Sequence, residues 1–230
     1  MDKNLNQLVE QLGHTDVFGQ LTNLERIKLA ELAVRKVLIK GEEICYQDDE
    51  SRFVLYIDRG SLHSVISSPD GRDHMVSAWG KGEEFWSHTL LDGGPMPSTL
   101  KAINKGTIIY LWVGEPVFDL VLNNHKATRA LIRRQTQLIR RRRESIYNLA
   151  FNPVASRLAK LILSKFATGD GYTVQRDLTL EDMASMIATS PEVICRIMYQ
   201  FQNEGFLKVN RTSITLDDHD ALEKLILRDK

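Results

Sequence analysis

The sequence predicts an α+β protein in which a small β-domain is followed by a long helix, two short helices and a β-hairpin. Three observations support this class. Short β-rich segments separated by Gly or Pro fill residues 36–113, residues 117–150 contain neither Pro nor Gly, and two helix-start patterns precede a hairpin near the C-terminus. The predicted domains are residues 1–115, 116–150 and 151–230.

The composition is that of an ordinary globular protein and excludes several classes. Of the 230 residues, 43% are hydrophobic and 26% are charged, which does not fit a chain that is disordered throughout. No run of 18 uncharged apolar residues is present, and the first residues lack an apolar signal core. We therefore expect a cytoplasmic protein without a membrane partner. Cys45 and Cys195 are too few for a disulfide framework or a four-ligand metal site.

The formal net charge of zero conceals an uneven distribution. Residues 1–123 contain 12 basic and 18 acidic residues, a net charge of −6, and the remainder of the chain carries +6. Such segregation is typical of a chain whose basic half binds a polyanion. The alternative is chance combined with the single run Arg140–Arg143. Four consecutive arginines cannot share one helical face, so this run predicts either contact with an anion or an acidic surface, or a solvated helix surface.

The N-terminal half is predicted to contain two helices and then strands. Residues 3–12 and 22–35 have helical character, and Thr22 with Glu25 has the spacing of a capping box. Residues 91–95 are predicted as a loop. Strands of this length and spacing are typical of an antiparallel sandwich or barrel, with Trp79, Trp86 and Trp112 in its core. The expected strands are 37–39, 53–57, 61–67, 74–79, 98–103 and 107–113, with a turn at Pro69-Asp70-Gly71.

Beyond Pro116 the pattern becomes helical and contains a heptad-like row. This row predicts a seam for a second copy of the chain, while packing against the chain's own β-domain is the alternative. Asn152 and Pro153 then begin another helix, which is expected to end at Thr168-Gly169. The predicted seam residues are Thr128, Leu131, Gln135, Leu138, Arg142, Ser145 and Leu149.

Residues 178–204 predict two helices joined by a tight turn. Thr179 and Asp182 form a capping box before the first helix, and Ser190-Pro191 opens the second. Gly205 ends the second helix, and two short apolar runs around Asn210-Arg211 predict a hairpin. Helix, turn, helix and β-wing together are the pattern of a winged helix-turn-helix.

This pattern fits DNA, because the second helix would enter the major groove with its N-terminal residues at the base edges. Glu192 and Arg196 lie four residues apart, and such side chains bond to cytosine and guanine respectively. The alternative is an ordinary surface Glu–Arg pair on a helix. The predicted DNA-contacting residues are Thr179, Thr189, Ser190, Pro191, Glu192, Cys195 and Arg196.

The whole order of elements resembles the Crp/Fnr family of bacterial transcription regulators. The most specific matches are LLDGGP at 90–95, NLAF at 148–151, PEVICRIM at 191–198 and QNEGFL at 202–207. The resemblance implies an N-terminal double-stranded β-helix or jelly-roll domain of the cyclic-nucleotide-binding type, a long dimerisation helix and a winged helix-turn-helix. It also implies a homodimer on a two-fold symmetric DNA operator, base reading by Glu192 and Arg196, and RNA polymerase as a partner if the protein activates. Cys195 replaces a serine that also reads bases in some members.

The same resemblance argues against two of the family's signals. Members that bind cAMP carry Gly-Glu and Arg-Ser pairs where this chain has Trp86-Ser87 and Met96-Pro97, and Thr-Ser where it has Arg142-Arg143. These six residues and His88 are the candidate effector pocket, and we expect no response to cAMP. The iron–sulfur members need four cysteines, so no such cluster is expected.

The segment Phe85–Thr89 is similar to the one that bears the haem-ligating histidine in the family's carbon-monoxide sensors. This similarity makes His88 a candidate haem ligand and a haem-based gas sensor the alternative function, whereas a structural histidine is the plainer interpretation. His63, His74 and His125 lack metal-ligand spacing and are expected to be surface or structural residues. No metal site is otherwise predicted.

Two further function classes compete with a DNA-binding regulator. One is a sensor that acts mainly through protein–protein contact with a vestigial DNA module. The other is an enzyme, but the sequence has no nucleophile elbow, no phosphate-binding GxxxxGK[ST] loop and no paired metal ligands, so we expect no enzymatic activity.

Overall fold

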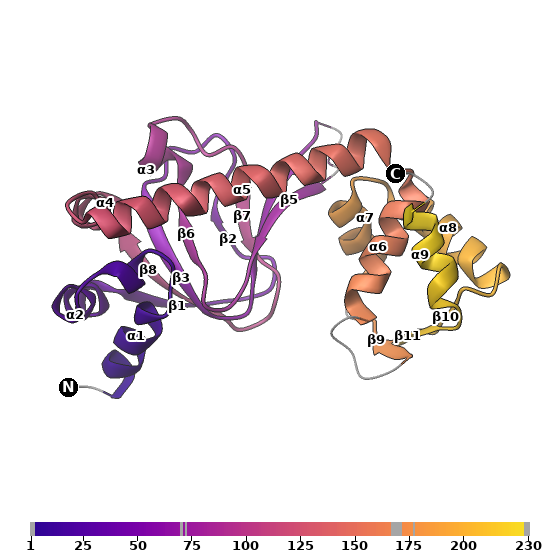
Figure 1. Cartoon of the computed structure of the whole chain (residues 1–230), viewed down its shortest axis with the longest axis horizontal. Helices are drawn as coiled ribbons and strands as arrows, with labels where there is room; N and C mark the ends of the chain where they lie inside the picture. Colours follow the sequence, from indigo (N-terminus) through magenta and orange to yellow (C-terminus); the bar gives the residue numbers. More distant parts are fainter. Residues whose placement is uncertain (1–2, 70, 72, 167–171, 177, 228–230) are drawn as a thin grey trace. The chain divides into compact units, whose positions relative to one another are not determined.

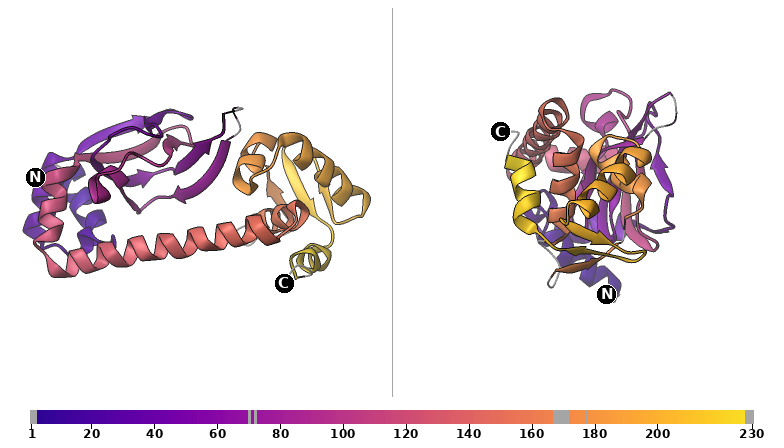
Figure 2. Two further views of the ribbon diagram at one scale, coloured as in Figure 1. Left: turned by 90° about the horizontal axis from the view of Figure 1, so that it is seen from above. Right: turned by 90° about the vertical axis from the view of Figure 1, so that its right-hand side faces the viewer.

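The computed structural model describes residues 3–69, 71, 73–166, 172–176 and 178–227 (Figure 1). They form two compact units, of which the first comprises residues 1–66 and 76–142 and the second residues 67–75 and 143–230. Helix α5 (His125–Phe151) contributes to both units, and Figure 2 shows it as one uninterrupted helix. No helix among the described residues has the length and apolar character needed to span a membrane. The predicted turn residue Asp70 and helix end Thr168-Gly169 lie outside the described residues.

The first unit begins with α1 (Lys3–Gly13), the short 3-10 helix η1 (Phe18–Gln20) and α2 (Asn23–Leu32). The predicted capping box is confirmed, because the Thr22 hydroxyl accepts from the Glu25 amide at 3.3 Å and Glu25 Oε2 accepts from the Thr22 amide at 2.7 Å. Helix α2 ends three residues before the predicted end at 35. The reason is that Val34 already belongs to a strand and pairs with Leu111.

Two four-stranded sheets form the predicted β-domain, with strand orders β1-β8-β3-β6 and β2-β7-β4-β5. The central strand β3 pairs antiparallel with both β6 and β8. The strands are β1 (Val34–Leu38), β2 (Glu43–Cys45), β3 (Phe53–Arg59), β4 (Leu62–Ser67), β5 (Asp73–Trp79), β6 (Glu84–Trp86), β7 (Thr99–Ala102) and β8 (Thr107–Val113).

Strand β3 separates two apolar cores because its side chains alternate between its faces. Leu55 and Ile57 lie in the core inside the β-domain, whereas Val54 and Tyr56 lie in a second core beneath the N-terminal helices and α5. The predicted burial of the three tryptophans is confirmed, and all are 3% exposed or less. Trp79 belongs to the inner core, while Trp86 and Trp112 belong to the outer one.

Several short elements of the first unit, among them η1, escaped prediction. Strands β2 and β6 have three residues each, too few to show a period of two, and are recognisable only by their partners β7 and β3. The loop predicted for residues 91–95 begins too early, because helix α3 (His88–Asp92) includes its first two residues. Gly93 ends α3 in the left-handed conformation, with φ of 77°, which glycine adopts without a steric penalty.

The single central helix predicted for residues 116–150 is wrong in one respect. Helix α4 (Gly114–Leu122) ends before α5 begins at His125. The Asn124 side chain causes this break, since its Oδ1 accepts from the amides of Lys126 and Ala127 at 3.1 Å each and so caps the start of α5. The absence of Pro and Gly therefore does not make the segment continuous.

The second unit packs helices against a small sheet of order β10-β11-β9 around one apolar core. The predicted helix pair and hairpin are present, whereas β9 and α9 were not predicted. The elements are α6 (Val154–Phe166), β9 (Thr173–Gln175), α7 (Leu180–Ile187), α8 (Pro191–Asn203), β10 (Leu207–Val209), β11 (Ser213–Leu216) and α9 (His219–Leu227).

Candidate nucleic-acid interface and effector pocket

The turn between α7 and α8 is fixed by the backbone and by one side chain from α6. Ala188 has φ of 52° and ψ of 66°, the left-handed conformation that redirects the chain after α7. Arg157 donates from its guanidinium to the carbonyl oxygen of Ile187, the last residue of α7. Burial lowers the pKa of Arg157 from its usual value. Sequence reasoning missed Arg157, and an arginine at the start of an apolar helix was the only signal.

Helix α8 has one buried and one exposed face. Its buried side chains belong to the core of the second unit and are Ile194, Ile197, Met198 and Phe201. Glu192, Cys195 and Arg196 are exposed, so the predicted base-reading pair lies on the free face. Tyr199, one turn beyond Arg196, is 67% exposed and extends this face. Sequence reasoning did not select Tyr199, although its spacing of seven from Glu192 was a usable signal.

The start of α8 differs from the prediction in the role of Ser190. This residue occupies the N-cap position, but its side chain makes no capping bond to the helix backbone. Its hydroxyl instead bonds to Glu192, and this bond, followed by one from the Glu192 backbone, lowers the pKa of the Glu192 carboxyl group. Glu192 is therefore an anionic hydrogen-bond acceptor at neutral pH. Thr189 and Pro191 are half-buried beside it.

Thr179 is held at the start of α7 by a reciprocal capping box. Its hydroxyl accepts from the Asp182 amide at 3.0 Å, and Asp182 Oδ2 accepts from the Thr179 amide at 3.0 Å. Because the capping bond uses only an acceptor site, the hydroxyl hydrogen of Thr179 remains able to donate to a phosphate. The residue is exposed, as that role requires.

The predicted hairpin is a three-stranded wing. Its turn closes through a bond from the Asn210 amide to the Ser213 carbonyl at 2.8 Å, and Arg211 in the turn is exposed. On β10, Lys208 pairs with Asp217 at 3.0 Å while remaining 72% exposed. Arg211 therefore adds an exposed positive charge to the unit that carries α8, whereas the charge of Lys208 is balanced by Asp217.

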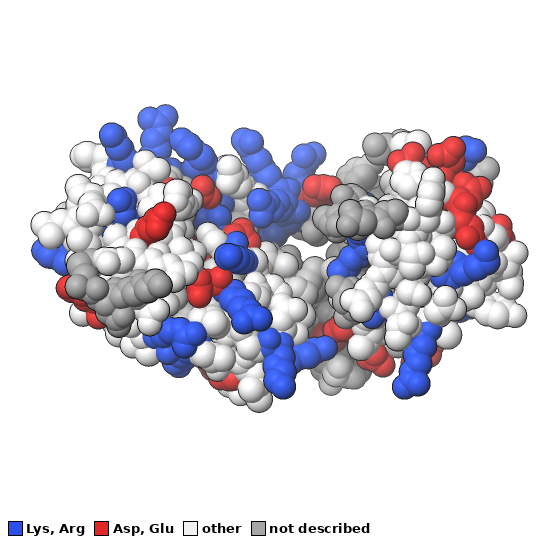
Figure 3. All heavy atoms as spheres, turned by 90° about the horizontal axis from the view of Figure 1, so that it is seen from below, with Lys and Arg blue, Asp and Glu red and all other residues white. Residues whose placement is uncertain are grey.

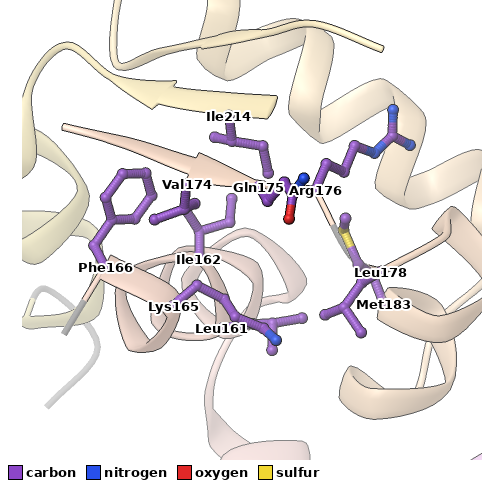
Figure 4. Close-up of a pocket in the computed structure, with 10 residues that line it drawn as sticks. All are labelled: Leu161, Ile162, Lys165, Phe166, Val174, Gln175, Arg176, Leu178, Met183 and Ile214. Atoms are coloured by element: carbon purple, nitrogen blue, oxygen red, sulfur yellow. The ribbon is translucent and has the colours of Figure 1, made fainter. Parts of the chain in front are cut away.

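A small pocket lies between α6 and the wing (Figure 4). The side chains of Ile162, Val174 and Ile214 point toward one another there, and its volume is about 20 Å³. This is about the space of one water molecule, and the lining is mainly apolar. It is therefore a packing space of the core and not an effector site.

The candidate effector pocket contains a group of buried polar atoms without partners. His88 and Arg142 meet there, with a guanidinium nitrogen of Arg142 3.3 Å from His88 Nε2. Because the guanidinium can only donate, Nε2 is the acceptor and the ring hydrogen lies on Nδ1. Burial, and then the charge of Arg142, lower the pKa of His88. His88 Nδ1, Thr89 Oγ1 and Arg142 Nε are buried and have no hydrogen-bond partner in the described part of the chain.

These three atoms all carry a hydrogen to donate. Leaving a buried donor unpaired costs roughly 1–3 kcal/mol, so the unpaired donors of His88 and Arg142, whose side chains are in contact, are candidates to bind a hydrogen-bond acceptor. The contact between Arg142 and His88 also tests whether His88 could be a haem ligand. Arg142 places a cation where an iron bound to Nε2 would lie, so the residues present do not fit an axial haem ligand through that atom.

Three other predicted pocket residues have structural roles instead, and a fourth is exposed. Trp86 lies in the outer core and donates from Nε1 to Glu84 at 3.2 Å. The Ser87 hydroxyl accepts from the Phe53 amide at 3.0 Å, and Met96 is buried in the inner core. Pro97 is exposed. Among the residues predicted for the pocket, the structure brings His88 and Arg142 together and does not bring Trp86, Met96 or Pro97 to them; Arg143 is exposed in the second unit.

One apolar residue of the predicted dimer seam is not available to a second copy. Leu131 is 5% exposed and packs in the outer core of its own unit, and the Thr128 hydroxyl donates to the Val121 carbonyl at 2.8 Å. Packing against the chain's own domain, which was the alternative, therefore holds at Leu131, whereas Leu138 is half-buried and Leu149 is exposed. The exposed apolar row lies one position further along, at Ile132, Ile139 and Ile146, which are 62–66% exposed at intervals of seven.

A β-domain, a long helix and an exposed helix face beside a wing together define a winged helix-turn-helix protein with an N-terminal β-domain. Two family models match the chain, the cyclic nucleotide-binding domain over residues 35–115 and the Crp-like helix-turn-helix domain over residues 156–225. The chain belongs to the Crp/Fnr family of transcription regulators.

Individual relatives are distant. The CRP-like cAMP-activated global transcriptional regulator of Mycobacterium tuberculosis is 24% identical over 190 residues, which cover 80% of this chain and 84% of that protein. The c-di-GMP responsive global regulator CLP of Xanthomonas campestris is similar in structure, with a TM-score of 0.74, 17% identity and coverage of 86% and 98%. FixK2 of Bradyrhizobium japonicum gives a TM-score of 0.69, 19% identity and coverage of 84% and 96%.

Proposed function

We propose that this transcription regulator is a homodimer that reads a two-fold symmetric operator and is controlled by an anionic effector other than cAMP. The observation that carries the proposal is the exposed face of α8, on which Glu192 and Arg196 are accessible while the opposite face is buried. Arginine bonds bidentately to guanine and glutamate accepts from cytosine in the major groove. Thr179 supplies a phosphate contact beside them.

Dimerisation through α5 is supported by the exposed row Ile132, Ile139 and Ile146. An interval of seven residues keeps a row on one side of a helix, which is the arrangement that two helices need for a shared seam. Two recognition helices would then lie about 34 Å apart, one turn of DNA. Where the dimer activates a promoter, RNA polymerase is its further partner.

An anionic effector is supported by the unpaired donors of His88 and Arg142, which are in contact. Arg142 also changes the reasons for expecting no response to cAMP. The absence of a cation at Met96-Pro97 is no longer one of them, because Arg142 could pair with a phosphate. The expectation now depends on Trp86-Ser87, which offers no carboxylate for a ribose hydroxyl. The relatives named above respond to cAMP in one case and c-di-GMP in another, which supports an effector that differs within one fold.

The DNA proposal is tested by selection from a pool of random duplexes with the full chain, followed by affinity measurements on the selected site. We expect a two-fold symmetric site and a loss of about 1–3 kcal/mol per half-site for Arg196→Ala at one base position. Arg211→Ala, in the wing, is the control and should weaken all sequences equally. Failure to enrich any duplex would refute the proposal and favour a sensor that acts through protein–protein contact.

The effector proposal is tested by thermal unfolding with cAMP, c-di-GMP, simple carboxylates and haemin, each with the wild type and Arg142→Gln. We expect an anion other than cAMP to raise the unfolding temperature of the wild type and not of the variant. Stabilisation by cAMP would refute the proposal. A Soret shift that depends on His88 would establish the haem alternative instead.

A further inference from the structure

A basic recess lies in the first unit between the segment before α2 and the first half of α5. Its volume is about 300 Å³, which is within the range of small-ligand sites. The residues of α5 that line the recess include four cations, and the facing segment contributes one carboxylate. We define the basic recess by its lining residues, which are Thr15, Asp16, Gln20, Lys126, Arg129, Ala130, Arg133, Arg134 and Gln137.

One of the four cations is already neutralised. Arg134 has a side chain only 10% exposed and bonds to Asp16 Oδ2 at 3.2 Å, Glu83 Oε1 at 3.2 Å and the Glu84 carbonyl at 3.0 Å. Its role is to hold α5 against the recess wall. Lys126, Arg129 and Arg133 are exposed and form no ion pair with another described residue. The recess therefore presents three uncompensated positive charges (Figure 3 shows Lys and Arg gathered along one edge of this unit).

These three cations converge because of their spacing. Lys126, Arg129 and Arg133 follow intervals of three and four, which places them on one face of α5 within about 11 Å along its axis. Three like charges so close repel one another, and an anion between them removes that repulsion. Gln20 and Gln137 add neutral hydrogen-bonding groups at the same recess.

The basic recess is distinct from the effector pocket. Arg133 and Arg142 are nine residues apart, which is about 13 Å along the helix. The recess also lies on a different side of α5 from the exposed row of Ile132 and Ile139. Lys126, Arg133 and Gln137 are about 100–160° around the helix from that row, and Arg129, the nearest, is about 60–80° from it. A ligand there leaves both the effector pocket and the row free.

We propose that the basic recess binds a small molecule that bears a diphosphate group. A diphosphate carries a charge of about −3 near neutral pH, since the second ionisation of a phosphoryl group has a pKa near 6, and this matches the three free cations. Arginine bonds to phosphate bidentately, and two of the three cations are arginines. A bound diphosphate would join Arg129 and Arg133 to the segment around Gln20 and reinforce the attachment that Arg134 makes.

The test is calorimetric titration of the full chain with inorganic pyrophosphate, and with ADP, at constant ionic strength. We expect one site per chain, and about tenfold or greater weakening for each arginine removed in Arg129→Gln and Arg133→Gln. Arg35→Gln/Lys36→Gln removes two exposed positive charges from β1 and should change the affinity less than twofold. Binding of ADP but not of pyrophosphate would show that a nucleoside is required.

Three results would overturn the proposal. The first is no saturable binding of either ligand. The second is equal weakening in the recess and β1 variants, which would indicate a diffuse charge effect. The third is loss of binding in Arg142→Gln with retention in Arg129→Gln, which would place the diphosphate in the effector pocket. Circular dichroism of each variant verifies that the chain remains folded.

Discussion

Replacing Glu84 by alanine should destabilise the first unit more than any surface change. Glu84 is 1% exposed, and its carboxylate lies between β6 and the start of η1. Oε1 accepts from the amides of Val17 at 3.2 Å and Phe18 at 3.0 Å, and Oε2 accepts from Trp86 Nε1 at 3.2 Å. Burial raises the pKa of this carboxyl group, although its hydrogen bonds and Arg134 oppose that effect.

The size of the effect follows from the three donors. Glu84→Ala leaves all of them buried without an acceptor, and each costs roughly 1–3 kcal/mol, but such neighbouring losses are not additive. We expect the free energy of unfolding to fall by about 3–5 kcal/mol, which is the usual cost of removing one member of a buried charged interaction. Glu84→Gln keeps an oxygen for the two amides but turns its amide group toward Trp86, so its loss should be about 1–3 kcal/mol.

The measurement is urea unfolding of the first unit, followed by tryptophan fluorescence, which the buried Trp86 makes sensitive to this site. Glu31→Ala, an exposed glutamate on α2, is the control and should change stability by less than about 0.5 kcal/mol. If Glu84→Ala cost less than about 1 kcal/mol, the carboxylate would not be the anchor of η1. An equal loss in the Ala and Gln variants would mean that the bond to Trp86 accounts for the effect.

Three further outcomes are expected. Ala188→Gly should stabilise the second unit by about 0.5–1 kcal/mol in urea unfolding because it relieves a left-handed residue, and Ala188→Val should do the reverse. Because the pKa of His88 is lowered in the folded chain, the unfolded chain becomes protonated at this residue at a higher pH than the folded chain. The free energy of unfolding should therefore fall as the pH drops below about 6.5, and His88→Gln should flatten that part of the curve of stability against pH. Burial raises the pKa of Cys45 to about 11, so a thiol reagent at pH 8 should modify Cys195 alone and thereby block DNA binding, and Cys195→Ser should abolish both effects.

The helix-turn-helix was predictable because its signals are local. The capping pair Thr179–Asp182, Pro191 and the apolar spacing of α8 each act within a few residues, and the structure has the elements that they predict. The role of Ser190 was not predictable, since either a backbone amide or the Glu192 carboxylate satisfies the same hydroxyl. Arg157 was missed because it acts thirty residues away in the chain, on the Ile187 carbonyl.

The helix α5 shows what a pattern alone cannot distinguish. The row containing Leu131 and the row containing Ile132 both have a period close to seven, and only the packing of the β-domain decides which one is buried. Ala127 and Ala130, beside Leu131, allow the close approach of that domain. The small residues Ala127 and Ala130, next to a row that has several polar members, were therefore the sequence signal that this side of α5 contacts the chain's own domain.

Contacts from α5 also suggest how a signal in the β-domain would reach that helix. Arg134 donates to the Glu84 carbonyl at the start of β6, and Arg142 contacts His88 just after the end of β6. Helix α5 therefore bonds to both ends of the same strand. Under the proposed control by an anion, the ligand would add a partner for Arg142 Nε at one end of β6 and leave the contact of Arg134 at the other end unchanged. We expect such a one-sided change to shift α5 relative to β6, with Arg134 as the fixed point. Arg134→Met, which removes that pivot, should therefore weaken the response of DNA binding to the effector more than it weakens effector binding itself.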